Sequence, residues 1–152
     1  MNMKDNNAQR LEQGFSLIEV LVTLLILAIG LLSIAAMQLR GLQYNQDAYM
    51  RSQVNMLAYD IADRMRLNKD NVADYVSNYT VTTTEPTACA QGSGTNANND
   101  LECWKQELWN GLPPGSTAIV AVNAGDPNMY DITISWSDRE NTARTVTYTF
   151  QP

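Results

Sequence analysis

Residues 15–39 read FSLIEVLVTLLILAIGLLSIAAMQL, and this apolar stretch decides the fold. None of the 20 positions from Val20 to Leu39 is charged. A helix of that length spans about 30 Å, which is the thickness of the hydrocarbon core of a bilayer. A buried core helix is the alternative, but the rest of a 152-residue chain could hardly cover such a helix on every side. The stretch therefore predicts a membrane-spanning helix.

The 14 residues before this stretch, MNMKDNNAQRLEQG, are largely polar. A secretory signal peptide is cut after its apolar run, whereas here the small residue suited to cleavage, Gly14, comes before it. We therefore expect the apolar helix to stay in the mature protein. Glu19 lies near the start of the run, and a carboxylate deep in lipid costs about 2.5–3.5 kcal/mol. Glu19 either lies hydrated among the headgroups or pairs with the amine that cleavage would free at Phe15, one helical turn away.

Residues 14–21, GFSLIEVL, resemble the processing motif of the type IV pilins and of the pseudopilins of type II secretion. The resemblance implies that residues 1–14 are a leader, which a prepilin peptidase removes by cutting between Gly14 and Phe15. It also implies that Phe15 becomes N-methylated and that Glu19 is the assembly carboxylate. Two features depart from the family pattern: acidic residues balance the basic ones in the leader, and no proline precedes Pro86.

Beyond Leu39 the sequence becomes amphipathic and continues without proline to residue 85. Apolar residues recur there at steps of three and four, the spacing of one helix face: Met50, Val54, Leu57, Ile61 and Met65. We expect one helix over residues 15–67, about 80 Å long. Residues 15–39 would lie in the membrane or in a fibre, and residues 40–67 would pack against a head domain.

Residues 57–68, LAYDIADRMRLN, resemble the corresponding segment of the PilV-type minor pilins. Four charged residues within this segment could form a carboxylate dyad or an anion-binding patch: Asp60, Asp63, Arg64 and Arg66. Near-neighbour ion pairs on a solvated helix face, each worth about 0.3 kcal/mol, are the simpler interpretation.

The expected head domain, residues 68–152, begins with a polar segment. Its first apolar residues predict a short amphipathic helix with Asp70 or Asn71 as the cap: Val72, Tyr75, Val76 and Tyr79. Residues 90–99 have the composition of an exposed loop. A second helix is expected to run from a cap at Asn99 or Asp100 to Gly111, with two apolar residues packed on a sheet: Trp104 and Leu108.

Cys89 and Cys103 bracket the expected loop. In a domain that is predicted to lie outside the cytoplasm, two cysteines predict one disulfide. The closed loop of 15 residues would stabilise the head by about 3 kcal/mol. Free buried thiols or a metal site are the alternatives, although the chain offers no second pair of ligands for a metal.

The last third of the chain alternates apolar and polar residues with a period of two. This pattern predicts strands at 117–123, 130–137 and 145–150, joined by turns. Polar residues on the alternate positions indicate an antiparallel meander with one covered face, and the long helix supplies the cover. The predicted fold is therefore α+β and type IV pilin-like, with a long N-terminal helix packed on a C-terminal antiparallel sheet.

Composition limits the possible functions. Histidine is absent, which excludes Cys–His and Ser–His catalytic pairs and every metal site that contains histidine. We expect no catalytic residue, no metal, no cofactor and no small-molecule substrate. The net charge of −6 disfavours nucleic acid as a partner.

The resemblance implies a minor pilin, a structural subunit of a type IV pilus that acts in priming or in a tip complex and affects adhesion. Its partners would be the prepilin peptidase, the inner membrane, and other major and minor pilins that contact the N-terminal helix. The head would be periplasmic until the subunit enters a pilus on the cell surface. Three alternatives stay open: a minor pseudopilin of type II secretion, a pilus adhesin or DNA-uptake pilin with a binding head, and an uncleaved single-span membrane protein.

Overall fold

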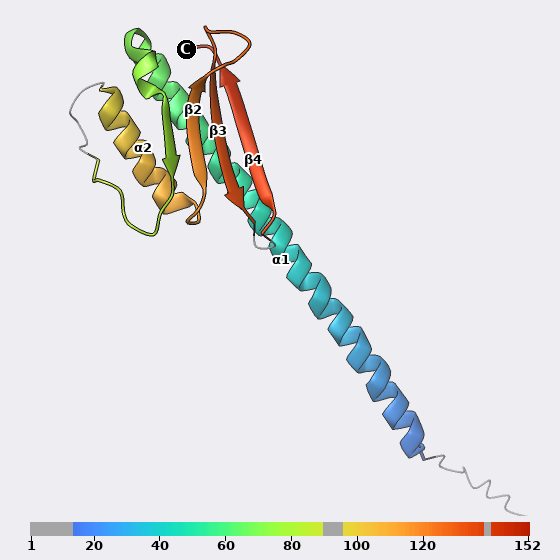
Figure 1. Ribbon diagram of the computed structural model, residues 1–152. Helices are drawn as coiled ribbons and strands as arrows, with labels where there is room; N and C mark the ends of the chain where they lie inside the picture. Colours follow the sequence, from blue (N-terminus) through green and yellow to red (C-terminus); the bar gives the residue numbers. More distant parts are fainter. Residues whose placement is uncertain (1–13, 90–95, 139–140) are drawn as a thin grey trace, which may run out of the picture. The chain divides into compact units, whose positions relative to one another are not determined.

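The computed structural model describes residues 14–89, 96–138 and 141–152 (Figure 1). Its elements follow the order α1 (Leu17–Leu67), the 3-10 helix η1 (Lys69–Tyr75), β1 (Ser77–Thr80), α2 (Ala97–Gly111), β2 (Thr117–Val122), β3 (Tyr130–Ser137) and β4 (Ala143–Phe150). The chain divides within α1 into two compact units, residues 1–42 and residues 43–152.

Helix α1 is continuous over 51 residues, close to the bounds that the apolar run and the amphipathic stripe predict. It begins where the backbone N–H groups of Glu19 and Val20 donate to the Ser16 carbonyl oxygen, at 3.0 and 3.3 Å. It ends before Asn68, whose φ of −121° and ψ of 51° are not helical. The absence of proline explains why one helix can extend so far.

The head, residues 43–152, contains a four-stranded sheet in the order β1-β2-β3-β4, and every neighbouring pair is antiparallel. The meander of β2, β3 and β4 confirms the strand prediction, although β4 begins two residues earlier than expected. On β3 the alternate residues Ile132, Ile134 and Trp136 are buried. They form the inner face of the sheet, as their period of two predicts.

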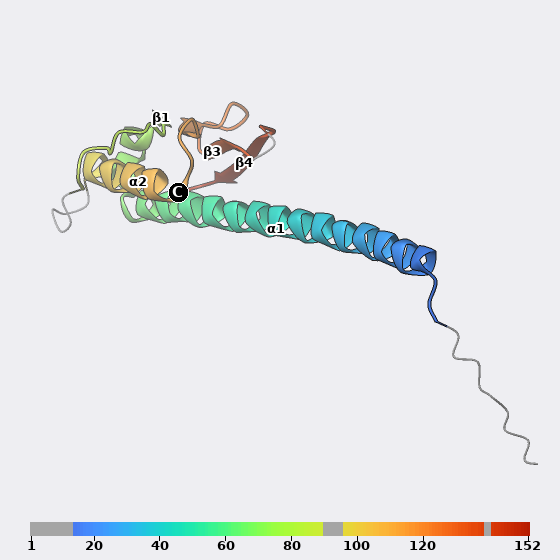
Figure 2. The same ribbon diagram turned by 90° about the horizontal axis from the view of Figure 1, so that it is seen from below.

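The predicted stripe of α1 supplies the other half of the core. Val54, Ile61 and Met65 are fully buried, Leu57 is nearly so, and Met50 packs at the margin. These side chains form one cluster with the inner face of the sheet and with Trp104 and Leu108 of α2. Figure 2 shows α2 beside the C-terminal part of α1. The covered sheet confirms the α+β fold class.

The short helix expected after residue 68 is only partly right. η1 begins at Lys69, outside the caps predicted at Asp70 and Asn71, and it ends at Tyr75. Val76 is extended, and Tyr79 lies in β1, where it pairs with Ala118 of β2. The spacing of Tyr75 and Tyr79 suits a helix, but pairing with a distant strand overrides that local preference.

The expected start of the second helix is also wrong. α2 begins at Ala97, and the side-chain oxygen of Asn96 caps it by accepting the Asn98 N–H at 3.1 Å. Asn99 and Asp100 therefore lie inside the helix, in its first turn. Of the loop expected at residues 90–99, residues 90–95 lie outside the described part of the chain, and residues 97–99 are helical. The predicted end at Gly111 is confirmed.

Candidate functional site

The N-terminal unit presents an apolar surface that nothing within it covers. Every residue from 14 to 42 is exposed, and Leu17 and Leu32 are 85% and 71% exposed. Among the described residues, α1 is the one helix that is long and apolar enough to cross a membrane. An apolar surface of this size requires lipid or other helices around it.

Two hydroxyl groups in this apolar stretch form hydrogen bonds within the helix itself. The Thr23 hydroxyl donates to the Val20 carbonyl oxygen at 2.9 Å, and the Ser33 hydroxyl donates to the Ile29 carbonyl oxygen at 2.9 Å. Glu19 differs, because no described side chain donates to its carboxylate. Its place in the first turn of α1 is favourable for a negative charge. Glu19 is the one charged group of residues 15–39, and no side chain among the described residues pairs with it.

Gly14 and Phe15 lie just before α1. Phe15 is 84% exposed and precedes Glu19 by four residues, about one helical turn. A Cβ atom added to Gly14 would meet no atom within 4 Å, so packing within the described chain does not require glycine there. The rest of the predicted leader, residues 1–13, lies outside the described part of the chain.

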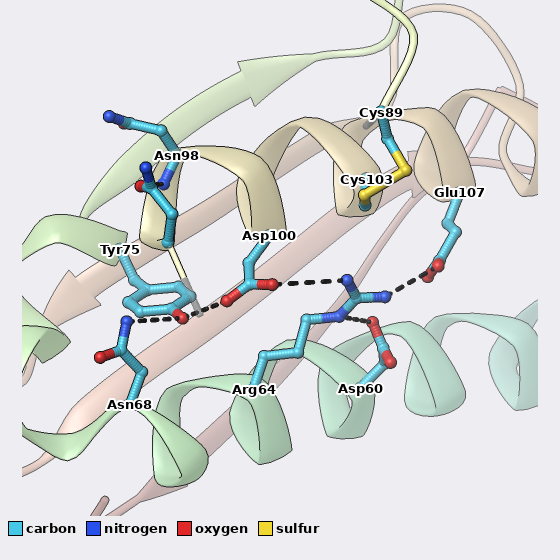
Figure 3. Close-up of polar contacts among 10 residues, drawn as sticks. Asp60, Arg64, Asn68, Tyr75, Cys89, Asn98, Asp100, Cys103 and Glu107 are labelled. Carbon is cyan, nitrogen blue, oxygen red and sulfur yellow. Dashed lines mark hydrogen bonds and ion pairs between the residues drawn. A yellow bond between two sulfur atoms is a disulfide. The ribbon is translucent and has the colours of Figure 1, made fainter. Parts of the chain in front are cut away.

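A second cluster of polar residues lies in the head, between α1 and α2 (Figure 3). Arg64 of α1 is its centre. The guanidinium group donates from Nε to Asp60 at 2.8 Å and from Nη2 to Glu107 of α2 at 2.9 Å, and Nη1 lies 3.9 Å from Asp100 of α2. One cation thus holds carboxylates from two helices.

The same cluster continues to η1. The Tyr75 hydroxyl donates to the Asp100 carboxylate and accepts a hydrogen bond from the Asn68 amide at 3.3 Å. Burial and the adjacent Asp100 carboxylate raise the pKa of Tyr75 to about 12, because both disfavour the phenolate. Burial and the charge of Asp60 raise the pKa of Glu107, and Arg64 opposes this rise.

These contacts give the head cluster a structural role. Arg64 forms the near-neighbour pair with Asp60 that the sequence predicts, as Arg66 does with Asp63 at 2.8 Å. The prediction of a purely solvated helix face is wrong for Arg64, because this residue also reaches α2. Among the described residues, no group of three or more Cys, Asp or Glu side chains is suited to hold a metal ion.

Cys89 and Cys103 are joined in a disulfide, with their Cα atoms 4.6 Å apart. The bond ties the segment that follows β1 to the middle of α2 (Figure 3). The Cys89 N–H also donates to the Gln106 side chain at 3.4 Å. The disulfide therefore holds the segment that follows β1 against α2.

Two contacts in the head could not be read from local pattern. Trp104 Nε1 donates to the Leu57 carbonyl oxygen at 2.8 Å, so Trp104 packs on α1 as well as near the sheet. Arg64 also joins elements that are far apart in the chain, since Glu107 follows it by 43 residues. The available signal was its position three residues after Ile61, at the margin of the buried stripe.

A bare apolar N-terminal helix that continues into an α+β head, with its C-terminal part packed on an antiparallel sheet, defines the fold class of the type IV pilins. Comparison with known families agrees with this class. The family model described as Type IV pilin Tt1218 matches residues 36–108, and the prokaryotic N-terminal methylation motif matches residues 9–35. No curated protein and no solved structure matches the chain significantly.

The chain belongs to the type IV pilins. This family consists of structural subunits and not of catalysts, and the chain carries the sequence motif that a prepilin peptidase processes. The apolar helix is consistent with anchoring in a membrane and with assembly into a pilus.

Proposed function

We propose that this pilin is a minor subunit of the PilV type, which is cleaved after Gly14 and N-methylated at Phe15. The observation that carries the proposal is the exposed apolar surface of α1, with Glu19 as its one charged group. Such a surface is stable in lipid or in a bundle of similar helices. The 14–21 motif and the resemblance of residues 57–68 to PilV-type pilins support the same reading.

Assembly then exchanges one apolar environment for another. In the inner membrane residues 15–39 contact lipid, and in a fibre they contact the equivalent helices of major and minor pilins. Because apolar burial changes little, the exchange itself supplies little free energy. A buried carboxylate without a partner is costly, so Glu19 favours the axial position that brings it to a free amine. The methylated amine of Phe15, in the same or a neighbouring subunit, is that partner.

The head would be periplasmic before assembly and would be carried to the cell surface in the pilus. Its helices are fixed to each other by Arg64, Trp104 and the disulfide. A head built this way suits a structural role in priming or in a tip complex, with adhesion as a consequence. A minor pseudopilin of type II secretion shares the N-terminal motif and is an outcome of the test.

The test is the location and the N terminus of the tagged full-length chain in cells with and without the prepilin peptidase. We expect sheared pili to contain a chain that starts at N-methylated Phe15, as determined by mass spectrometry. Without the peptidase, the uncut chain should stay in the inner membrane. An intact Met1 in assembled pili, or recovery of the mature chain only with a type II secretion complex, would overturn the proposal.

A further inference from the structure

Strand β4 forms one edge of the sheet, and in the described part of the chain no strand pairs with its outer side. The opposite edge, β1, has α2 beside it (Figure 1). Lys105 Nζ of α2 lies 6.0 Å from the centre of the Tyr79 ring of β1. β4 has eight residues and no proline. Long unprotected edges of this kind pair readily with another strand. We infer that β4 receives an extended strand from a different pilus subunit, an inference that rests on the proposed function.

The register identifies the backbone groups that would pair. In an antiparallel ladder, hydrogen-bonded and non-hydrogen-bonded residue pairs alternate. The Asp138 N–H donates to the Thr142 carbonyl oxygen at 3.0 Å, and Ile134 lies opposite Val146. Continuing this alternation, the even-numbered residues of β4 bond to β3. The N–H and C=O groups of three exposed residues then point to the free edge: Thr145, Thr147 and Thr149.

The side chains of these three threonines already have partners on β3. Their hydroxyl groups contact Ser135 at 2.9 Å, Thr133 at 3.2 Å and Asp131 at 2.6 Å, respectively. The hydroxyl row therefore needs no external ligand. What the edge offers a partner is its row of backbone donors and acceptors, and an extended strand is the chemistry that satisfies such a row.

The side chains of α1 that lie next to β4 indicate which residues the added strand should contain. Tyr148 of β4 is half-buried and makes an edge-to-face contact with Tyr59 of α1, with ring centroids 4.7 Å apart. Tyr59 is 51% exposed and Met56 is 66% exposed. A fifth strand would place every second side chain against this apolar margin. Those side chains should be apolar, and the alternate ones should be polar like the threonines of β4.

Charge favours a neutral strand. Arg144 is the one charged residue of β4, and it lies at the beginning of the strand. Its guanidinium group is paired with Asp138 at 3.1 Å and lies 3.9 Å from Asp47 of α1. The other cation at this edge is Arg66 of α1, which donates to the Tyr148 hydroxyl at 3.3 Å and is paired with Asp63 at 2.8 Å. Each cation beside β4 thus already has an acidic partner.

A second copy of this chain does not fit the edge. β4 and α1 run in the same direction, because Arg144 lies near Asp47, Tyr148 lies near Tyr59, and Phe150 lies near Arg66. Antiparallel pairing of two β4 strands about a two-fold axis would reverse residues 43–67 of one α1 relative to those of the other. Two copies that enter one membrane or fibre by the same helix must run in the same direction. Parallel pairing would place the two α1 helices on opposite faces of the joined sheet, so the partner is a different subunit.

The variant Thr147→Pro tests the inference in cells. Proline at residue 147 removes an outward N–H but leaves the bonds to β3, a position that proline tolerates in an edge strand. Thr147→Val is the matched control, because it removes the hydroxyl and keeps the N–H. We expect Thr147→Pro to reach the membrane at the wild-type level but to fall at least about fivefold in sheared pili, with Thr147→Val unchanged. Equal recovery of the two variants would overturn the inference, whereas absence of the wild-type chain from pili would overturn the proposed function.

Hydrogen exchange keeps the inference testable if Thr147→Pro does not fold. The measurement compares the full wild-type chain in detergent with the same chain in sheared pili, using residue-resolved mass spectrometry. We expect the amides of Thr145, Thr147 and Thr149 to exchange fast in detergent and at least about tenfold more slowly in pili. The amides of Val146 and Tyr148 should be protected in both samples. Fast exchange of the three threonine amides in pili would overturn the inference.

Discussion

The indole Nε1 of Trp104 donates a hydrogen bond to the backbone carbonyl oxygen of Leu57, at 2.8 Å and across 47 residues of sequence. Trp104 is fully buried, and Leu57 belongs to the stripe by which α1 enters the core. This hydrogen bond therefore fixes α2 of the head to α1. An apolar ring alone would fill the same space without fixing the orientation of α2 on α1.

Replacing Trp104 by Phe should keep most of the packing and lose this hydrogen bond. The Leu57 carbonyl oxygen would lose one donor, and part of the indole volume would become a cavity. We expect the free energy of unfolding of the full chain in detergent to fall by about 2 kcal/mol. Trp109→Phe is the control, because Trp109 lies on the same helix and is only partly buried. Equal stability of the two variants would argue against the role assigned to Trp104.

Arg64→Met should destabilise the head by about 2 kcal/mol near neutral pH, because it leaves the carboxylates of Asp60, Asp100 and Glu107 without their shared cation. Burial and the charge of Asp60 already raise the pKa of Glu107, so the folded chain binds this proton more tightly than the unfolded chain does. Stability from that protonation is present at acid pH and is lost as the pH rises through the raised pKa. The difference between variant and wild type should therefore shrink in acid.

Urea unfolding at several pH values, monitored by circular dichroism, measures this effect. Arg51→Met is the matched control on the same helix, because Arg51 is exposed and should leave stability unchanged. A loss of stability by Arg64→Met that is the same at acid and neutral pH would contradict the ionic role.

The sequence predicts those elements that depend on neighbouring residues, and it fails for those that depend on residues far along the chain. The long helix and the meander are predicted because each has a period that a local reading detects, and the stripe from Met50 to Met65 even identifies the buried face. β1 has only four residues and exists because β2 lies about 40 residues later in the chain to pair with it. The local sequence of β1 is equally compatible with a continuation of the helix η1.

The two polar sites differ in the same way. The sequence itself identifies the first site. An apolar run begins directly after Gly14, its first residue is Phe15, and one charged residue, Glu19, interrupts it. The sequence does not identify the cluster around Arg64, because Asp100 and Glu107 reach it only after α2 has packed on α1. Asp100 suggested a helix cap, a role that Asn96 takes instead.

The phenol of Tyr75 should lose its proton at a higher pH than an ordinary tyrosine does. Its pKa is raised to about 12 by burial and by the Asp100 carboxylate, from an ordinary value of 10.0. The folded chain thus holds this proton more tightly than the unfolded chain does. The resulting stability is present below pH 10.0 and is lost as the pH rises through about 12. Phenolate absorbance should show a late component that Tyr75→Phe removes, and an unchanged titration curve in that variant would contradict the assignment.

Removing the disulfide should weaken the head without changing the anchor. The chain-entropy relation for a loop of this size gives a loss of about 3 kcal/mol for Cys89→Ser or Cys103→Ser. The double Cys89→Ser, Cys103→Ser variant should lose little more than either single one, because either change removes the same bond. Melting in detergent, with and without a thiol reductant, measures this. A reductant that leaves the wild-type melting temperature unchanged would contradict the expected contribution.

The central claim is that Glu19 selects the assembled position by pairing with an amine, and Glu19→Gln tests it most directly. This change removes the charge and keeps the shape, while Thr23→Val is the control one turn further along, where the hydroxyl is already bonded to the Val20 carbonyl oxygen. The measurement is the amount of each full-length variant in the inner membrane and in sheared pili. We predict normal membrane levels for both, normal recovery of Thr23→Val in pili, and at least about a tenfold loss for Glu19→Gln, equivalent to about 1.4 kcal/mol. Recovery of Glu19→Gln in pili at the wild-type level would contradict the account.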